Sequence, residues 1–309
     1  MQRDAYDVVI AGGSWAGLAA ALQLGRARRR VLVLDAGLPR NRFAQASHGF
    51  LGQDGGSPAV ILETFRAQVL AYATVRIRED TAVHASASGE ESFTIELASG
   101  DLLRAACVIL ATGIVDVLPP IPGVAERWGR TVLHCPYCHG YEVADRRLGV
   151  LATSDLAVHQ ASLLPDWSPD VTLFTNGIIT LDTDQRALLT ARGVRVEPRR
   201  VTALSGDAPA LDGVQLEGGS VFPLDALFTA PPIRLAGTLA EQLGCEIGEG
   251  PLGPHIRTDA RQQTTVPHVF AAGDAARTTY SATFAAADGA MAGISAHQSL
   301  ALAAHAAGR

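Results

Sequence analysis

The sequence predicts an α/β protein of two domains, each built on a parallel sheet. With 309 residues the chain is longer than a single hydrophobic core usually supports. A β-branched run at residues 6–11 passes directly into a glycine turn and an alanine-rich segment, and a similar strand begins at residue 148. A third strand ends in Gly-Asp near the far end of the chain. Strands that alternate with helical segments are typical of parallel sheets covered by helices.

Composition and charge narrow the class of protein. Hydrophobic residues make up 48% of the chain and charged residues 18%, as in an ordinary soluble enzyme. A net charge of −6 disfavours nucleic acid or an anionic membrane as the main partner. Residues 1–6 run directly into an apolar strand, and no apolar stretch reaches about 18 residues. We therefore expect a cytoplasmic protein with no secretory signal, membrane span or nucleic-acid partner.

A dinucleotide-binding unit is predicted at the start of the chain. The strand at 6–11 leads into Gly12-Gly13-Ser14-Trp15-Ala16-Gly17, and a second strand at 30–35 ends in Asp35. Glycines let the backbone approach a pyrophosphate, the helix amino terminus favours its charge, and the acid accepts ribose hydroxyls. Ser14 replaces the second glycine of the usual pattern, and we expect the turn to tolerate it. The alternative is an ordinary strand-to-helix turn.

Cys135 and Cys138 are two residues apart and can close and reopen a small disulfide, which stores two electrons. With His139 they also match a c-type haem attachment site, but haem attachment needs an exported chain. A structural zinc site needs two further ligands, and Cys107 and Cys245 are each expected to be buried as small hydrophobes. The pattern therefore favours a redox-active disulfide.

Two further segments resemble FAD motifs. Residues 264–274 form a strand that ends in Gly273-Asp274 and precedes an alanine-rich helix from about Ser281 to Ser295, as in the second FAD motif of two-dinucleotide-binding flavoproteins. Residues 108–113 resemble the Ala-Thr-Gly strand end that closes over the same FAD. With these marks in order, the chain resembles the low-molecular-weight thioredoxin reductase family over nearly its whole length.

The resemblance implies two Rossmann-like dinucleotide-binding domains and a homodimer. An FAD domain would comprise residues 1–117 and 245–309, and an inserted NAD(P)H-domain-like module, residues 118–244, would carry the cysteine pair. Residues 119–123, rich in proline, would form the first connection, and residues 237–250 the return. The residues it implies for FAD binding are Gly12, Gly13, Ser14, Ala16, Gly17, Asp35, Ala36, Arg42, His48, Val83, Ala111, Thr112, Gly113, Gly273, Asp274, Ser281 and Ala282.

The second nucleotide fingerprint is missing. Where NADPH-using relatives read G-G-G-N-x-A, residues 152–157 read Ala-Thr-Ser-Asp-Leu-Ala. Asp155 places a negative charge near the expected phosphates, and like charges about 4 Å apart cost on the order of several kcal/mol. The strand at 171–174 leads into Thr-Asn-Gly instead of the His-Arg-Arg cluster that holds the 2′-phosphate of NADPH. The alternative is that a weaker nicotinamide site survives elsewhere.

This narrower pattern resembles the thioredoxin-reductase-like dithiol oxidases of the gliotoxin and holomycin type, which act without NADPH. The segments that carry the resemblance are residues 135–142 and 47–55. His139 stands where reductases usually have Asp, and Tyr280-Ser281 stands where they carry Arg-Gln against the flavin. By family position, Cys138 would lie against the flavin and Cys135 would face the substrate.

The predicted chemistry is thiol–disulfide exchange. A substrate thiolate attacks Cys135, a second thiol releases the oxidised product, and FAD passes the electrons to oxygen or another acceptor. His139 is the candidate proton carrier and Glu142 would orient it, with packing or capping roles as the alternatives. The partner is expected to be a small dithiol or disulfide, or a thioredoxin-like protein. An NAD(P)H-dependent reductase with a degenerate nucleotide site and a non-catalytic flavin redox sensor are the alternative functions.

Overall fold

The computed structural model describes residues 5–89 and 92–307, and the chain divides into two compact units. Unit 1 comprises Met1–Arg42, Pro58–Val115 and Arg234–Arg309, and unit 2 comprises Phe43–Ser57 and Asp116–Ile233. Compared with the limits expected from the sequence, unit 2 ends at Ile233 rather than at residue 244, and it includes Phe43–Ser57. The strands β7 (Ile114–Asp116) and β16 (Ile233–Leu235) pair with each other where the chain leaves and re-enters unit 1.

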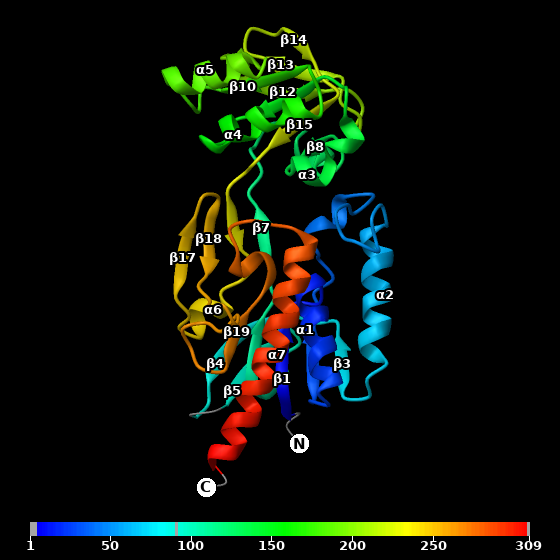
Figure 1. Ribbon diagram of the computed structural model, residues 1–309, viewed down its shortest axis with the longest axis vertical. Coiled ribbons are helices and arrows are strands. Elements are labelled where there is room, and N and C mark those ends of the chain that lie inside the picture. The colour runs from blue at the N-terminus through cyan, green and yellow to red at the C-terminus, as the bar shows by residue number, and fades with distance from the viewer. Residues whose placement is uncertain (1–4, 90–91, 308–309) are drawn as a thin grey trace. The chain divides into compact units, whose positions relative to one another are not determined.

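Unit 1 is built on a seven-stranded mixed sheet with the order β3-β2-β1-β6-β5-β4, and β19 also pairs with β6. Strands β1, β2, β3, β6 and β19 run parallel to one another. Strands β4 and β5 form an antiparallel hairpin, and β5 pairs antiparallel with β6 (Figure 1). The strands are β1 (Ala5–Ala11), β2 (Val31–Leu34), β3 (Val75–Arg78), β4 (Ala82–Ala87), β5 (Phe93–Leu97), β6 (Leu102–Leu110) and β19 (Val269–Ala271).

The carboxyl ends of four parallel strands lie in one row. Ala11 pairs with Leu34 on one side and with Leu110 on the other, and Leu110 also pairs with Ala271. All four side chains are buried. The segments that follow these strands therefore leave the sheet at the same edge, where α/β proteins bind nucleotides.

Three long helices belong to unit 1: α1 (Trp15–Arg26), α2 (Pro58–Leu70) and α7 (Ala282–Ala307). The sequence predicts α7 only to about residue 295, and the structure continues it through the alanine-rich tail. The remaining short elements of this unit are η1 (Arg40–Phe43), α6 (Leu239–Gln242), β17 (Ile247–Gly250), β18 (Gly253–Ile256) and η5 (Gly273–Ala276).

Glycines allow α1 and α7 to pack with their backbones in close approach. A Cβ on Gly289 would lie 2.0 Å from the Ala16 carbonyl oxygen, and one on Gly293 would lie 2.6 Å from that of Ala20. No side chain fits at such distances, because carbon and oxygen atoms that are not bonded to each other do not approach so closely. The small residues of both helices thus hold α1, and with it the turn that precedes α1, close against α7.

Unit 2 contains a five-stranded parallel sheet with the order β11-β10-β9-β15-β8. Its strands are β8 (Val132–Leu133), β9 (Leu148–Leu151), β10 (Val171–Phe174), β11 (Arg195–Glu197) and β15 (Ala226–Thr229). The helical elements are η2 (Ala125–Arg127), α3 (Pro136–His139), η3 (Tyr141–Val143), α4 (Leu156–Leu163), η4 (Leu164–Asp166) and α5 (Thr183–Ala191). A three-stranded antiparallel sheet is formed by β12 (Val201–Ser205), β13 (Gly213–Leu216) and β14 (Val221–Pro223).

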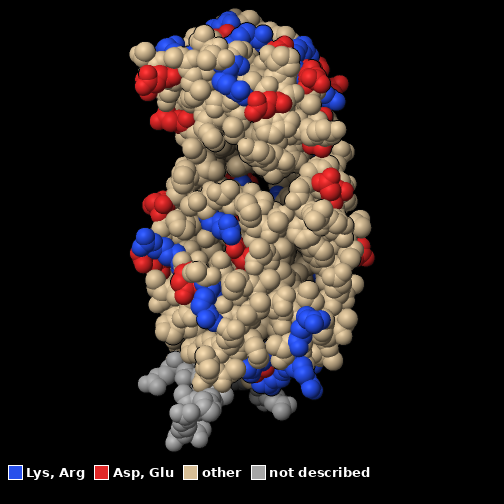
Figure 2. Space-filling view, viewed as in Figure 1, with Lys and Arg blue, Asp and Glu red and all other residues tan. Residues whose placement is uncertain are grey.

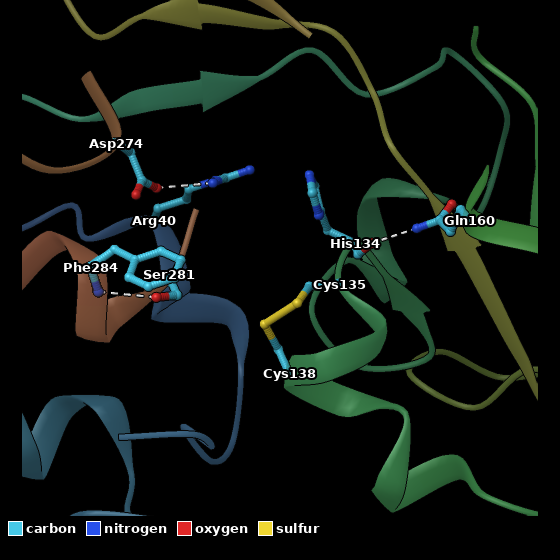
Figure 3. Close-up of a disulfide and its surroundings, with 8 residues drawn as sticks. All are labelled: Arg40, His134, Cys135, Cys138, Gln160, Asp274, Ser281 and Phe284. Carbon is cyan, nitrogen blue, oxygen red and sulfur yellow. Dashed lines mark hydrogen bonds and ion pairs between the residues drawn. A yellow bond between two sulfur atoms is a disulfide. The ribbon is translucent and has the colours of Figure 1, made fainter. Parts of the chain in front are cut away.

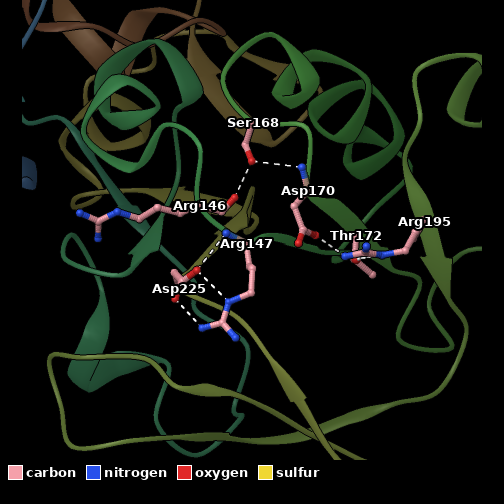
Figure 4. A network of polar contacts seen from close by, with 7 residues as sticks. All are labelled: Arg146, Arg147, Ser168, Asp170, Thr172, Arg195 and Asp225. Carbon is pink, nitrogen blue, oxygen red and sulfur yellow. Dashed lines mark hydrogen bonds and ion pairs between the residues drawn. The ribbon is translucent and has the colours of Figure 1, made fainter.

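Ion pairs join the starts of the strands in unit 2 (Figure 4). The Arg147 guanidinium donates to Asp225 at 2.6 and 2.9 Å, which ties the start of β9 to the start of β15. These hydrogen bonds lower the pKa of Asp225 to about 2. The pair is partly exposed, so water screens it and it contributes little to stability.

Charged residues are spread over the surface. On the face drawn in Figure 2, acidic and basic residues lie interspersed over much of the described surface. Within the described part of the chain, no helix is long and apolar enough to cross a bilayer.

We predict that Gly289→Ala destabilises the protein. The new methyl group would collide with the Ala16 carbonyl, and overpacking of this kind costs about 1–3 kcal/mol, more than the roughly 1 kcal/mol that alanine gains in a helix. A lower midpoint of urea unfolding measures the loss. Ala287→Leu adds volume on the exposed face of the same helix at little cost in helix propensity, and should leave the midpoint nearly unchanged. Equal midpoints for the two variants would contradict the close packing.

Candidate functional site

The predicted dinucleotide turn has the bare backbone that its function requires. Gly12 has φ +116°, and a Cβ there would lie 2.1 Å from the Ala111 carbonyl oxygen. A Cβ on Gly13 would lie 2.4 Å from the Cβ of Asp35, and one on Gly17 would collide with the Gly12 carbonyl. Only glycine fits at these positions, which explains the residue type at each. These glycines let the turn pack closely against the end of β6, against Asp35 and against itself.

Asp35 and Asp274 lie at the carboxyl edge of the unit 1 sheet, and each forms an ion pair with an arginine. Asp35, which is 8% exposed, accepts hydrogen bonds from the backbone NH of Gly37 and from the Arg66 guanidinium. Asp274 accepts from Arg40 at 2.9 Å, and Figure 3 shows the Arg40 guanidinium aimed at that carboxylate. The same guanidinium lies 4.6 Å from the centre of the Tyr280 ring. Both carboxylates are therefore fixed in place beside a positive charge.

The chain's own residues fit FAD at this edge. Ser14 caps α1 without a side-chain hydrogen bond, and the first turn of this helix contains no acid, so its NH groups and dipole can favour a pyrophosphate. Within the described residues, the Asn41 Oδ1 and Arg66 Nε atoms are buried without a hydrogen-bond partner. Buried polar atoms normally have partners, and a bound nucleotide would supply them.

The other residues expected to bind FAD lie at several places. Ala111, Thr112 and Gly113 follow β6, and Gly273 begins η5, so both groups share the edge with Gly12. The Ser281 Oγ accepts from the Phe284 NH at 3.0 Å at the start of α7, next to Ala282 (Figure 3). Ala16 lies in the first turn of α1, whereas Ala36 and Arg42 are exposed, and Val83 is 46% exposed on β4. His48 belongs to unit 2. Their roles stay predictions.

The cysteine pair forms a disulfide in unit 2. Cys135 and Cys138 are bonded, with their Cα atoms 5.2 Å apart, and Cys135 caps the short helix α3 with Pro136 at its first position (Figure 3). Proline is suited to that position because its fixed φ matches the helix and the helix needs no NH there. Both cysteines are partly exposed, so a substrate thiol can reach the pair.

Neighbouring elements of unit 2 hold the disulfide segment in place. The Gln160 amide of α4 donates to the His134 carbonyl at 2.6 Å, directly before Cys135. Tyr137 meets Trp167 edge to face, with ring centres 5.4 Å apart. A Cβ on Gly140 would lie 3.0 Å from the Trp167 ring and 2.6 Å from the Pro136 carbonyl oxygen. Gly140 is needed here for close packing rather than for an unusual φ.

His139 follows the second cysteine and is partly buried. Burial lowers the pKa of His139; the negative charge of Glu142 opposes this shift, and His48 adds to it. The Glu142 carboxylate oxygen lies 3.3 Å from the Nε2 atom of His48. Glu142 thus acts on His139 through its charge, and the expectation that it orients the His139 ring stays a prediction.

The remaining two cysteines have no access to this site. Cys107 and Cys245 are both buried, as expected from the sequence. Burial raises the pKa of Cys107 to about 12 and also raises that of Cys245, so both are protonated thiols at neutral pH. Among the described residues, no cluster of His, Cys, Asp and Glu has the make-up of a metal site.

Residues 6–305 match the family model described as pyridine nucleotide-disulphide oxidoreductase. The chain belongs to this family. Thioredoxin reductase tcpT of Claviceps purpurea is 35% identical over 277 residues, which are 87% of this chain and 86% of that protein. Thioredoxin reductase sirT of Leptosphaeria maculans is 32% identical, over 88% and 87% of the two chains. The solved oxidoreductase from Agrobacterium tumefaciens is 49% identical, with a TM-score of 0.91 over 96% of this chain and 99% of that chain.

Membership of the family settles the class of chemistry. The protein is a thioredoxin-reductase-like disulfide oxidoreductase with two dinucleotide-binding folds, and the family implies that it binds a flavin. Among the described residues, the structure forms a disulfide between Cys135 and Cys138.

Sequence reasoning missed the partners of the predicted site residues. Arg40 and Arg66 lie in no recognisable motif, and their pairing with Asp274 and Asp35 follows only from the fold. Gln160 and Trp167, which support the disulfide segment, are likewise ordinary residues of a helix and a loop in the sequence. For these residues no spacing rule supplied a signal.

We predict that Asp274→Asn weakens flavin binding by about tenfold or more. A hydrogen bond to a charged group contributes about 1.5–3 kcal/mol, and a tenfold change in affinity is about 1.4 kcal/mol. The ratio of flavin to protein absorbance after gel filtration measures the change. Glu249→Gln, an exposed acid of the same unit, is the control and should retain its flavin. Full flavin content in Asp274→Asn would show that Asp274 does not contribute to flavin binding.

Proposed function

We propose that the protein is an FAD-dependent dithiol oxidase that acts without NADPH. The observation that carries the proposal is a contrast between two equivalent turns. The turn after β1 is bare glycine backbone, whereas the turn after β9 is filled by side chains. We infer that the first turn takes a dinucleotide and that the second does not.

Side chains close the turn after β9. The Thr153 hydroxyl donates to the Ala230 carbonyl at 2.7 Å, which ties this turn to the end of β15. Asp155 is the exposed cap of α4. A pyrophosphate would have to displace the first contact and face the Asp155 carboxylate, which disfavours its binding.

The arginine that follows the end of β11 is already engaged. Arg199 donates to the Glu197 carboxylate at 2.7 and 2.9 Å. A 2′-phosphate would compete with this carboxylate for the same guanidinium group. Recognition of NADPH through a free arginine pair is therefore not supported.

One observation favours a second candidate, an NAD(P)H-dependent reductase with a degenerate site. The Arg200 side chain lies beside Gly177, at the turn after β10, where a Cβ would be 3.2 Å from the Arg200 Nε atom. This turn is otherwise tied to β12, since the Asn176 side chain accepts from the Val201 NH. A third candidate is a flavin redox sensor that turns over no substrate.

The proposed reaction is exchange at the cysteine pair. A substrate thiolate attacks the Cys135 Sγ, the Cys135–Cys138 bond breaks, and Cys138 leaves as a thiolate. The second substrate thiol, once deprotonated, attacks the substrate sulfur bound to Cys135 and releases a disulfide product. Two electrons then remain on the cysteines as two thiols. Bound FAD would supply the two-electron acceptor that returns the pair to the disulfide, with oxygen or another acceptor next in line.

His139 serves this exchange as the proton carrier. Partial burial lowers its pKa, so the ring is neutral near neutral pH and can accept the proton of an attacking thiol. The small dithiol is the substrate that the proposal favours, and a thioredoxin-like protein is the alternative. A cytoplasmic location and a homodimer belong to the same proposal and rest on the family resemblance.

We predict that a dithiol, and not NADPH, reduces the bound flavin. Without oxygen, a small dithiol such as dithiothreitol should bleach the flavin absorbance, and admission of air should restore it with formation of peroxide. NADPH or NADH at stoichiometric concentration should leave the absorbance unchanged. Cys135→Ser and Cys138→Ser are the matched controls, and both should abolish bleaching by the dithiol. Rapid bleaching by NADPH would establish the reductase instead, and no response to either would leave the sensor.

We predict that the contribution of His139 is lost only at low pH. His139→Gln should slow disulfide opening by dithiothreitol by about 10²- to 10⁴-fold at neutral pH. The ratio of wild-type to variant rates cancels the ionisation of the dithiol itself. Because burial lowers the pKa of His139, this ratio should stay constant on the neutral side and decline on acidification with a midpoint below about 6.5. A midpoint above that value, or no decline, would contradict a buried neutral base.

A further inference from the structure

We propose that His48, Glu142 and Asp54 form a proton outlet for His139, in which His48 is a positioning residue that holds the Glu142 carboxylate. This proposal rests on the dithiol chemistry proposed above and adds a part to it. The observation behind it is that His48 lies between two carboxylates. Its Nε2 atom is 3.3 Å from Glu142, and its Nδ1 atom is 3.6 Å from Asp54.

The loop that carries His48 is closed by its own backbone. The Ser47 NH donates to the Gly56 carbonyl at 2.8 Å, and the Gly55 NH donates to the Ser47 carbonyl at 2.9 Å. The Asp54 carboxylate accepts from the Gly49 NH at 2.8 Å. These bonds bring Asp54 back beside His48 although five residues lie between them in the chain. His48 is thus held from one side by its own loop and meets Glu142 on the other.

Glu142 joins this loop to the disulfide segment. It lies in η3, three residues after His139, and both follow the cysteine pair directly. One carboxylate therefore serves two histidines: it contacts His48 and acts through its charge on His139. Two protonated histidines on one carboxylate would repel each other, so the arrangement favours one proton at a time.

All three side chains of the cluster reach water. The His48 side chain is 21% exposed, that of Glu142 39%, and that of Asp54 68%. His139 itself is partly buried. A proton that His139 takes from a substrate thiol can thus pass to the Glu142 carboxylate, which meets water directly, while His48 holds that carboxylate in place.

The proton balance of the exchange calls for such an outlet. When the first substrate thiol attacks Cys135, its proton goes to His139, while Cys138 leaves as a thiolate. The proton must either be returned to that sulfur or leave before His139 accepts the proton of the second thiol. The dithiol supplies both electrons, and the cysteines hold them. His139 can act on both thiols because Glu142, held in place by His48, passes the first proton to the solvent.

The test is the titration of His139, followed by NMR of histidine-labelled protein. The signal missing from His139→Gln identifies this residue. His48→Gln removes a group that lowers the pKa of His139 and leaves Glu142 facing His139 alone, so the pKa of His139 should rise. Glu142→Gln removes the opposing negative charge, so it should fall. We expect shifts of about half a unit or more in opposite directions.

A double variant separates positioning from a direct charge effect. If His48 acts by holding Glu142, His48→Gln/Glu142→Gln should titrate like Glu142→Gln alone. His159→Gln and Glu126→Gln change exposed residues of the same unit and should leave the titration unmoved. His48→Asn is the second variant if His48→Gln does not fold. Shifts in the same direction, or none, would overturn the proposal.

The outcome is independent of whether the protein proves to be a dithiol oxidase. Alkylation of free thiols after addition of dithiothreitol reports directly whether the Cys135–Cys138 bond opens. If the bond stays closed while the His139 shifts are opposite, the oxidase function fails and the coupled cluster stands. The bond may instead open while the rate of opening falls with decreasing pH in the same way in His48→Gln, Glu142→Gln and the wild type. In that case the proposed proton outlet is wrong and the proposed oxidase function stands.

Discussion

Parallel pairing around β6 is the constraint on which the rest of unit 1 depends. This strand pairs with β1 on one side and with β19 on the other, so Ala11, Leu110 and Ala271 end in one row. The segments after these strands come from the beginning, the middle and the end of the chain. Hydrogen bonding along the ladder aligns them because a parallel register places all carboxyl ends at the same edge. The acid, the glycines and the helix terminus of the nucleotide site meet only for this reason.

The two units show how one strand–turn–helix arrangement acquires different properties from its turn. Where Gly12 and Gly13 stand, the Ala111 carbonyl and the Asp35 side chain sterically exclude any side chain. At the equivalent place in unit 2, Thr153 bonds across to the end of β15 and Asp155 carries a charge. Both turns follow a parallel strand, so the residues of the turn make the difference between them.

The disulfide depends on a different kind of support. Its segment is short, so Gln160, Trp167 and the tight approach at Gly140 fix it from neighbouring elements. Two opposing effects set the pKa of His139: burial lowers it, and the negative charge of Glu142 raises it. The same carboxylate contacts His48, so the protonation of the two histidines is linked through one group. Such linkage is a property of the cluster and not of any one residue.

The sequence by itself determined the α/β class, the strand–glycine–helix unit with Asp35, the burial of Cys107 and Cys245, and the family, because these depend on local pattern and spacing. Tertiary structure decided the pairing of Arg40 with Asp274, the assignment of residues 43–57 to unit 2 and the contact of His48 with Glu142. The residues of each pair lie some 90 or more positions apart in the sequence, and no local spacing rule reaches so far. Only the packed chain brings these charges within hydrogen-bonding distance.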